Sequence, residues 1–397
     1  MNLEIKDLVL KGLLDGAKAF VGPETVQFDI TNRCNNNCLC CWRNSPLLGE
    51  SSEEDKREKE FELPFSVIKK TIDELKIMGT KKIFFAGGGD PFVHPKIMKI
   101  LRYAKKCKMK IYINTNFTLV DKKRARELVK LKVDHIHVSV LAGNSKTYSL
   151  VHPNKSEEMF CKIKKVLKYI AVLKKNRRQH LYNPLPHINL YYVIFNKNYK
   201  DINEMVDLAI YVKSDTMEFT PIDVVAGKTD SLLLDAEQIN SVTNDVKNNI
   251  GRLRKCNKSQ SVKINIEQSE NFLKRINSSL ALEGKYESKT VINQPCYVGW
   301  AFARITADGE VNPCLKAHRI SIGNIYKNSF EEIWNSPEEQ EFRRKSFNLN
   351  LNDIYLKDIG NDPNLTFGCL QSCDNLQISL DMNKKYIDIL RGYGKVK

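Results

Sequence analysis

Three cysteines near the start of the chain have the spacing of ligands to an iron–sulfur cluster with one unprotected iron. Cys34, Cys38 and Cys41 form the pattern C-x3-C-x2-C. A cube of four irons and four sulfides takes four ligands, so three thiolates leave one iron open. That iron can chelate the amino and carboxylate groups of S-adenosylmethionine (SAM), and an electron from the cluster can then cleave SAM to a carbon radical that abstracts hydrogen. The pattern therefore predicts a [4Fe-4S] cluster and SAM as cofactors.

Zinc is the alternative occupant of this cysteine-rich loop. Zinc sites usually combine one C-x2-C unit with a second pair of Cys or His residues, and no such pair follows within the next forty residues. A fourth thiol, Cys40, does not fit the ligand spacing. We therefore interpret Cys40 as a residue that packs beside the cofactor.

A second set of cysteines near the end of the chain makes a complete ligand set: Cys296, Cys314, Cys369 and Cys373. Zinc fits this number equally well. We favour a second [4Fe-4S] cluster, because the first region already indicates one-electron chemistry. Ligation by thiolates alone would suit electron transfer, and an open iron would suit substrate binding.

Three further cysteines, Cys107, Cys161 and Cys256, fall outside both sets. Each is expected to be a small buried apolar residue, although one of them could act as a hydrogen-atom donor. The clustering of the other thiols and the lack of an export signal favour reduced cysteines in a cytoplasmic protein over disulfides. No catalytic side chain is assigned from the sequence.

Glycines and polar residues follow several predicted strands, where a cofactor could bind. Glycine lets the backbone approach a ligand closely and take a positive φ, and a carboxylate or carbonyl could accept hydrogen bonds from the ammonium group of SAM. Turn and cap roles would explain each residue singly. Their shared place at the carboxyl edge of a sheet favours a binding role. The candidate SAM-binding residues are Cys40, Gly88, Gly89, Asp90, Pro91, Asn116, Ser139 and Asn196.

Strand-like and helix-like segments alternate over the first part of the chain. The strands are nearly continuous apolar runs, which is typical of a parallel sheet covered by helices. Six units fall short of the eight that close a barrel, so we predict an α/β fold with a partial (β/α)6 TIM-like barrel and a lateral mouth. The strands are expected at residues 26–31, 82–86, 110–115, 135–140, 188–195 and 217–221, and the helices at 64–78, 95–107, 122–130, 157–173 and 202–212.

The pattern changes after the sixth strand. We predict an N-terminal helix in residues 1–22, the barrel in 23–222, a connector in 223–295 and a smaller auxiliary-cluster domain in 296–397. The segments expected beyond the barrel are a helix at 235–249, a strand at 262–266, a helix near 269–283, a turn at Asp308-Gly309, a helix at 329–345 and a helix finished by 383–397.

Composition and charge exclude some classes of protein. The chain has 397 residues, 42% of them hydrophobic, and no apolar run long enough to span a membrane. The formal net charge is +16, with the lysines dispersed over many segments. Dispersed lysine is typical of a solvated surface, although it could also steer an anionic substrate. Nucleic acid is a weak candidate partner, because no aromatic residues interleave with the basic ones in an RNA-binding pattern.

At these motifs the chain resembles the radical SAM superfamily. Its cysteine pattern matches the cluster motif of that family. The stretch Gly88-Gly89-Asp90-Pro91 resembles the family's Gly-Gly-Glu-Pro motif, with a shorter Asp in place of Glu. Asn116 and Ser139 resemble positions that face the ribose and methionine of SAM. The resemblance implies a [4Fe-4S] cluster held by Cys34, Cys38 and Cys41.

From Cys296 onward the chain is similar to the auxiliary-cluster extensions called SPASM and twitch domains. Cys296-x12-Gly309-x4-Cys314 fits their opening pattern, and Gly323-Asn324-Ile325 and Glu332-Ile333-Trp334 resemble its sequel. A full SPASM domain has enough cysteines for two clusters, so four cysteines favour a twitch-like module with one auxiliary [4Fe-4S] cluster. The spacing of the first pair resembles that of a dehydrogenase that oxidises an aminocyclitol alcohol.

The resemblance implies a radical SAM oxidoreductase or epimerase that removes hydrogen from a substrate C–H bond. An external one-electron reductant such as flavodoxin or ferredoxin would supply the electron. We expect a small sugar-like or aminocyclitol-like substrate, which could be anionic. The alternative is maturation of a ribosomally made peptide by crosslinking, epimerisation or oxidation, but only about twenty residues precede the first strand, fewer than a leader-peptide recognition domain needs. A zinc-bearing nucleic-acid-binding protein is a more distant alternative.

Overall fold

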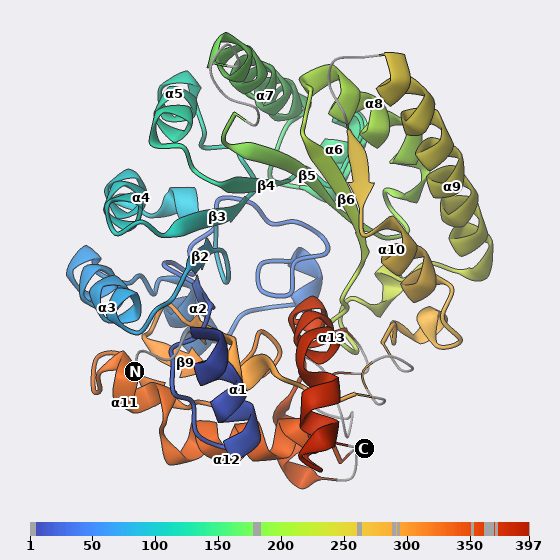
Figure 1. Cartoon of the computed structure of the whole chain (residues 1–397). Helices are drawn as coiled ribbons and strands as arrows, with labels where there is room; N and C mark the ends of the chain where they lie inside the picture. Colours follow the sequence, from blue (N-terminus) through green and yellow to red (C-terminus); the bar gives the residue numbers. More distant parts are fainter. Residues whose placement is uncertain are drawn as a thin grey trace.

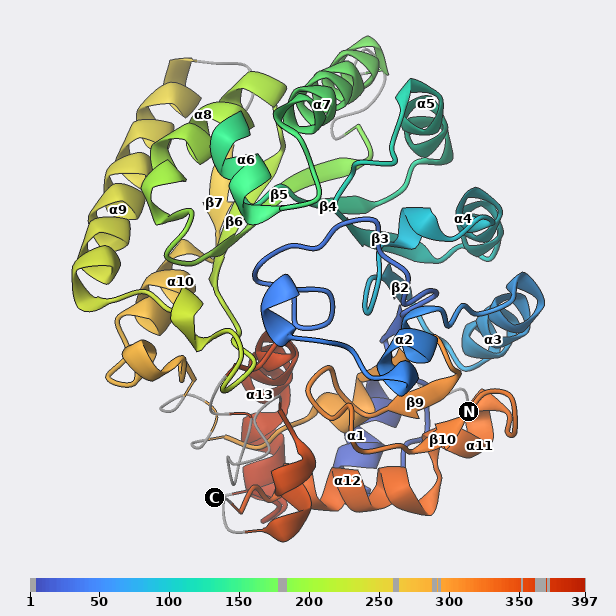
Figure 2. The same cartoon turned by 180° about the vertical axis from the view of Figure 1, so that it is seen from behind.

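The computed structural model describes residues 5–177, 184–259, 264–287, 291, 294–350, 353–360, 369 and 372–396. Within these ranges the strands form one ten-stranded sheet in the order β10-β9-β8-β1-β2-β3-β4-β5-β6-β7 (Figures 1 and 2). The strands are β1 (Thr25–Phe28), β2 (Lys82–Phe85), β3 (Lys110–Thr115), β4 (His135–Ser139), β5 (His187–Ile194), β6 (Thr216–Pro221), β7 (Asn265–Glu267), β8 (Phe302–Ile305), β9 (Glu310–Asn312) and β10 (Gly323–Asn324).

Helices cover the outer face of the curved sheet, and the loop between β1 and α2 lies on its inner side (Figures 1 and 2). The α-helices are α1 (Ile5–Asp15), α2 (Glu53–Lys59), α3 (Phe65–Ile77), α4 (Ile97–Lys106), α5 (Lys122–Leu131), α6 (Ser145–Val151), α7 (Glu157–Arg177), α8 (Ile202–Val212), α9 (Ala236–Ser259), α10 (Ser269–Ile276), α11 (Phe330–Trp334), α12 (Pro337–Phe347) and α13 (Leu376–Gly392).

The alternation of side chains along a strand explains this arrangement. In β3, Ile111 and Ile113 are fully buried against the helices, whereas Tyr112 and Asn114 point to the opposite, inner face. β3 pairs in parallel with β4, and Tyr112 lies opposite His135. The inner face therefore carries polar and aromatic side chains, and the apolar core lies between the sheet and the helices.

The predicted barrel is confirmed in its main elements. Each of the six predicted strands and five predicted helices is present, with ends that differ by a few residues at most, and the helix predicted at 202–212 matches α8. The N-terminal helix is also present, as α1. The consecutive strands β1 to β6 pair in parallel, as predicted.

The segment predicted as a connector contributes a further parallel strand to the sheet. Strand β7, from the expected connector, pairs in parallel with β6 and extends the sheet. Helix α9 continues ten residues past the predicted end, to Ser259. The strand predicted at 262–266 overlaps β7, and residues 260–263 lie outside the described part of the chain.

The C-terminal segment joins the barrel rather than forming a sheet of its own. Strand β8 pairs in parallel with β1, and all four of its residues are buried. The turn predicted at Asp308-Gly309 is confirmed between the antiparallel strands β8 and β9, and Gly309 has a φ of +88°. The helix predicted at 329–345 is two helices, because Ser336 caps a new helix with Pro337 at its start.

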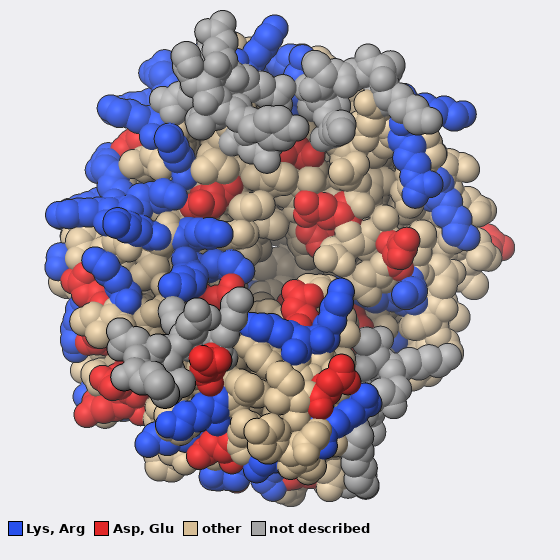
Figure 3. Space-filling view, in the orientation of Figure 1, with Lys and Arg blue, Asp and Glu red and all other residues tan. Residues whose placement is uncertain are grey.

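Charge is distributed unevenly over the surface. In the view of Figure 3, Lys and Arg side chains are dense along the edge formed by α3, α4 and α5, and acidic side chains lie beside a central hollow. Within the described ranges, none of the helices combines the length and the apolar character that a membrane span needs.

Candidate functional site

A cavity of about 700 Å³ occupies the inner side of the sheet. The cysteine-rich loop that follows β1 forms one wall, and residues at the carboxyl ends of β2, β3 and β4 form the next. The predicted site residues that line this cavity are Cys34, Cys38, Cys40, Cys41, Gly89, Asp90, Asn116, Ser139 and Cys373. The structure therefore brings most of the predicted SAM site together with the three predicted cluster ligands.

The cysteine-rich loop is held by backbone hydrogen bonds. The Leu39 amide donates to the Val151 carbonyl at the end of α6 (3.0 Å). Two backbone amides of the loop donate to sulfur, Asn36 to Cys34 Sγ (3.5 Å) and Asn44 to Cys41 Sγ (3.2 Å). Amide donors stabilise negative charge on a sulfur, so the loop is built to hold thiolates.

The electrostatics of these thiols fit a metal cluster. Burial raises the pKa of Cys34 to about 11, and the charge of Asp90 adds to this rise. Burial, followed by the charges of Cys40, Cys41 and Cys34, raises the pKa of Cys38 well above its ordinary value. Thiolates this close together and this buried need a compensating cation, and iron supplies one.

The spacing of the donors also bears on the type of metal site. In the described part of the chain, no three Cys, His, Asp or Glu side chains lie close enough together to hold one metal ion. The thiolates of an iron–sulfur cube bind different irons, so a cube accepts donors that are further apart than the ligands of one zinc ion.

The glycines after β2 allow the cysteine-rich loop to pass close to this strand. A Cβ on Gly87 would lie 1.8 Å from Asp29 Cγ, and one on Gly88 would lie 2.2 Å from Asn32 Oδ1. A Cβ on Gly89 would lie 2.1 Å from the Arg33 carbonyl oxygen. The glycines are therefore required by the protein's own packing, and Gly88 and Pro91 are not among the described residues that line the cavity.

Asp90 uses its carboxylate to join two strand ends. One oxygen accepts from the Phe92 amide (2.8 Å), and the other accepts from Thr115 Oγ1 (2.8 Å) and the Asn116 amide (2.7 Å). The predicted contact of this carboxylate with the ammonium of SAM would have to compete with these three donors. Burial raises the pKa of Asp90, while its hydrogen bonds to Asn116 and Thr115 lower it.

The polar residues predicted after later strands differ in position. Asn116 Nδ2 lies 3.8 Å from Cys34 Sγ, next to the cysteine-rich loop. Ser139 lines the cavity. Asn196 instead donates from Nδ2 to the Ser231 carbonyl (2.7 Å) and is not among the described residues that line the cavity. Its position after β5 resembled that of a ligand contact, but the side chain anchors the segment that follows β6.

The second set of cysteines gathers around a smaller neighbouring cavity. Cys296, Cys314, Cys369 and Cys373 all line it. Burial and then the charge of Cys296 raise the pKa of Cys314 to about 12. The pKa of Cys369 is raised well above its ordinary value by burial and then by the charges of Cys373, Cys314 and Cys296. The structure thus brings the four predicted ligands together across more than seventy residues of chain.

Several charged residues of the cavity wall were not predicted from the sequence. Arg304 on β8 donates from Nε to Oδ2 of Asp29, the residue that follows β1 (2.8 Å), and both side chains are buried. Lys316 forms ion pairs with Asp223 and Asp374. Arg304 and Lys316 flank Cys314 in the sequence, which was the one signal that could have pointed to them.

The inner face of the sheet adds a carboxyl group with an unusual pKa. Glu218 on β6 lines the cavity, and Asn189 Nδ2 donates to its Oε2 (3.2 Å). Burial, together with the charge of Glu267, raises the pKa of Glu218 to about 7. The same Asn189 amide lies 3.1 Å from His137 Nδ1. Alternation along β6 was the only sequence signal for this inward-facing carboxyl.

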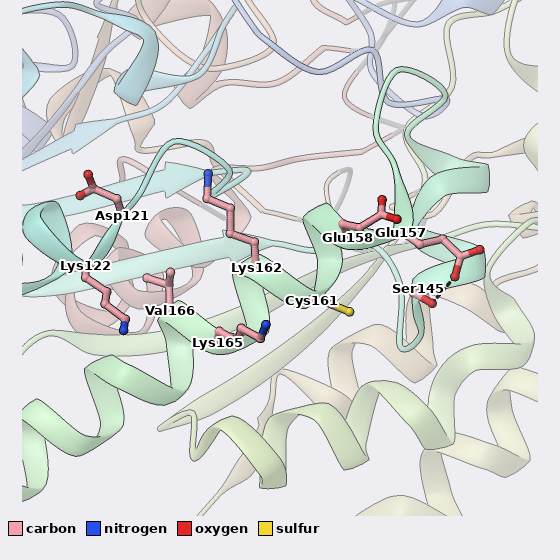
Figure 4. Close-up of a pocket in the computed structure, with 9 residues that line it drawn as sticks. All are labelled: Asp121, Lys122, Ser145, Glu157, Glu158, Cys161, Lys162, Lys165 and Val166. Carbon is pink, nitrogen blue, oxygen red and sulfur yellow. Dashed lines mark hydrogen bonds between the residues drawn. The ribbon is translucent and has the colours of Figure 1, made fainter.

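The remaining cysteines lie elsewhere. Cys107 is buried at the end of α4, 3.9 Å from Asp73 Oδ1. Cys161 on α7 is exposed, contrary to the prediction of a buried residue, in an outer pocket whose lining includes residues of α5, α6 and α7 (Figure 4). The side chain of Cys256 lies outside the described residues. Cys40 is the thiol outside the ligand pattern that lines the main cavity.

Comparisons with known proteins agree with this geometry. Residues 28–209 match the family model of the radical SAM superfamily, and residues 296–354 match that of SPASM, an iron–sulfur cluster-binding domain. The chain is 26% identical to the tungsten-containing aldehyde ferredoxin oxidoreductase cofactor-modifying protein of Pyrococcus furiosus, over 79% of this chain and 82% of that protein.

Two further proteins have a name or a title that concerns bacteriocin biosynthesis or a precursor peptide. The chain is 26% identical to the antilisterial bacteriocin subtilosin biosynthesis protein AlbA of Bacillus subtilis, over 81% of this chain but 62% of AlbA. Streptococcus suis SuiB bound to its precursor peptide SuiA has a similar fold, with a TM-score of 0.59 at 16% identity over 85% of this chain and 70% of SuiB. The radical SAM domain uses a [4Fe-4S] cluster and SAM, and the SPASM domain carries auxiliary iron–sulfur binding. The chain is therefore a radical SAM enzyme with a C-terminal SPASM-type domain.

Proposed function

We propose that this enzyme matures a peptide or protein substrate by radical chemistry. The observation that carries the proposal is that both cysteine sites face one cavity, with Cys34, Cys38 and Cys41 on one wall and Cys373 on another. A radical generated at the first site and an acceptor at the second would then act on the same bound substrate. The cavity is large enough for a side chain and the neighbouring backbone of a peptide.

The residues divide into three roles in this proposal. Cys34, Cys38 and Cys41 would hold the cluster that binds SAM, and the four later cysteines would hold an auxiliary [4Fe-4S] cluster. When bound, the first cluster and SAM supply hydrogen-atom abstraction. Asn116, Ser139 and the backbone at Gly89 would contact SAM, and Asp90 would fix the ends of β2 and β3 around it. An external one-electron reductant, such as flavodoxin or ferredoxin, would start the reaction.

The peptide alternative has more support than the sugar-like substrate that we expected first. AlbA takes its name from bacteriocin biosynthesis, and SuiB has been crystallised with a precursor peptide. The relative from Pyrococcus furiosus supports a second candidate, modification of a cofactor.

The proposal can be tested with anaerobically reconstituted protein. We expect about eight irons and matching sulfide per chain, for two cubes, and 5′-deoxyadenosine formation from SAM after reduction. A short peptide encoded beside the gene should raise this yield and emerge oxidised, crosslinked or epimerised by mass spectrometry in deuterated water. Zinc with negligible iron would overturn the radical function. Conversion of an aminocyclitol or a cofactor, with the peptide unchanged, would overturn the choice of a peptide.

A further inference from the structure

The two cavities share a wall that is one layer of side chains thick. Five residues line both of them: Lys316, Cys373, Asp374, Asn375 and Leu376. Four come from the segment that leads into α13, and Lys316 comes from the segment after β9. A charge in this wall therefore lies next to whatever the four cysteines hold and also next to the substrate cavity.

Lys316 carries such a charge. Its side chain is 10% exposed and forms ion pairs with Asp223 and Asp374, the latter at 3.5 Å. Paired with two carboxylates and almost enclosed, Lys316 is a cation in a place with little water to screen it.

The two carboxylates that pair with Lys316 offset its positive charge to different extents. Asp374 is 49% exposed, so water and salt screen much of its charge. Asp223 is 27% exposed and belongs to the main cavity rather than the smaller one. Glu287 is a further buried anion that acts on Cys373, but it is paired with Arg275 at 2.6 Å. Of the two charged residues that line both cavities, Lys316 is therefore less screened than Asp374.

We propose that Lys316 is a positioning residue that raises the reduction potential of the auxiliary cluster held by Cys296, Cys314, Cys369 and Cys373. The proposal rests on the proposed function, because it requires a cluster at these cysteines. Adding an electron makes a cluster more negative, and a nearby cation stabilises the reduced form. Removing the cation therefore favours the oxidised form, and removing a neighbouring anion does the opposite.

The test is a redox titration of the reconstituted full chain, followed by electron paramagnetic resonance. Addition of SAM changes the signal of the cluster that binds it, which separates the two clusters in one sample. For Lys316→Met we expect the ratio of reduced to oxidised auxiliary cluster to fall about tenfold at a fixed ambient potential. The cluster that binds SAM should keep its potential. Lys316→Arg keeps the charge and should resemble the wild type, and Asp374→Asn should shift the ratio upward.

A matched control is Lys345→Met in the same domain. Lys345 also forms an ion pair, with Asp353 at 2.7 Å, but lines neither cavity, so its loss should leave the auxiliary potential unchanged. An unchanged ratio in Lys316→Met, or shifts of the same sign in Lys316→Met and Asp374→Asn, would overturn the proposal alone. A wild-type chain with SAM-responsive iron but no second iron–sulfur signal would overturn it together with the auxiliary cluster of the proposed function.

Discussion

At the scale of single residues, Asp90 is a structural member of the site. Its carboxylate accepts three hydrogen bonds from buried or partly buried donors at the ends of β2 and β3. Asp90→Ala leaves these donors without their partner, and we expect it to lower the free energy of unfolding by about 2–4 kcal/mol. Chemical denaturation of the metal-free chain measures this loss.

The N-cap of helix α5 serves as the reference for the loss of stability in Asp90→Ala. Asp121 caps α5 by accepting from the Arg124 amide (2.7 Å) at an exposed site. Asp121→Ala should cost about 1 kcal/mol. If Asp90→Ala costs no more than Asp121→Ala, the carboxylate of Asp90 does not hold the two strand ends together, and a direct contact with SAM becomes the better role for it.

Glu218 predicts a pH dependence of stability. Its pKa is raised from 4.5 to about 7 in the folded chain, so the folded state binds the extra proton between these values. The contribution of Glu218 to stability is therefore fully present below the ordinary pKa of 4.5, and it is lost as the pH rises through the folded-state pKa of about 7. Glu218→Gln imitates the protonated form. Between pH 4.5 and 7.5, the free energy of unfolding of this variant should rise relative to that of the wild type by up to about 3 kcal/mol. Denaturation at each pH measures the difference, and a difference that does not change with pH would contradict the raised pKa.

At the scale of elements, the first strands and helices were predictable because each carries its own pattern. The apolar run of β5 and the helical period of α8 are local signals, and both segments were found where expected. Strand β7 overlaps the strand predicted at 262–266, but its pairing with β6 has no local signal in the sequence. The pairing of β8 with β1 is equally invisible in sequence, because it joins segments almost three hundred residues apart.

The candidate site was predictable to a similar extent. The cysteine spacings predicted both sets of candidate sulfur ligands, which line two neighbouring cavities of the structure, since ligand chemistry restricts the residue types. Asn196 shows the limit of such a pattern, because a polar residue after a strand looks the same whether it faces the cavity or anchors a loop. Lys316 was missed because its role depends on Asp223 and Asp374, which lie far from it in the chain.

The close packing of Gly87, which follows β2, against Asp29, which follows β1, leads to a prediction. The φ of Gly87 is +113°, and a Cβ would collide with the carboxylate of Asp29 at 1.8 Å. Gly87→Ala should displace the cysteine-rich loop and cause loss of the SAM-binding cluster, with retention of the auxiliary one. Gly16→Ala is the control, because Gly16 also has a positive φ of +86° but no atom lies within 4 Å of its Cβ position. Iron content and the SAM-responsive signal measure the outcome, and equal cluster loading in the two variants would contradict the steric argument.

At the scale of the whole molecule, the continuous sheet links the two cysteine sites mechanically. Strand β8 pairs with β1 on the side opposite β2, and the Arg304–Asp29 ion pair also joins the C-terminal segment to the barrel there. Helix α13 follows directly after the wall that the two cavities share and packs against α1 at the other end of the chain. The C-terminal segment is thus part of the barrel's support as well as the holder of its own cysteines.

This linkage predicts that residues 296–397 cannot be removed without loss of the barrel. Truncation after residue 295 would expose the edge of β1, where Val26 and Phe28 are fully buried, and leave the carboxylate of Asp29 buried without Arg304. An uncompensated buried charge alone costs about 3–5 kcal/mol, and an exposed apolar edge promotes aggregation. We expect the truncated chain to be insoluble, or to lack the cooperative unfolding and the SAM-binding cluster of the full chain. Expression, circular dichroism and iron analysis check this. A soluble truncated chain that unfolds cooperatively and still cleaves SAM would show instead that the predicted boundary at residue 296 separates two independent domains.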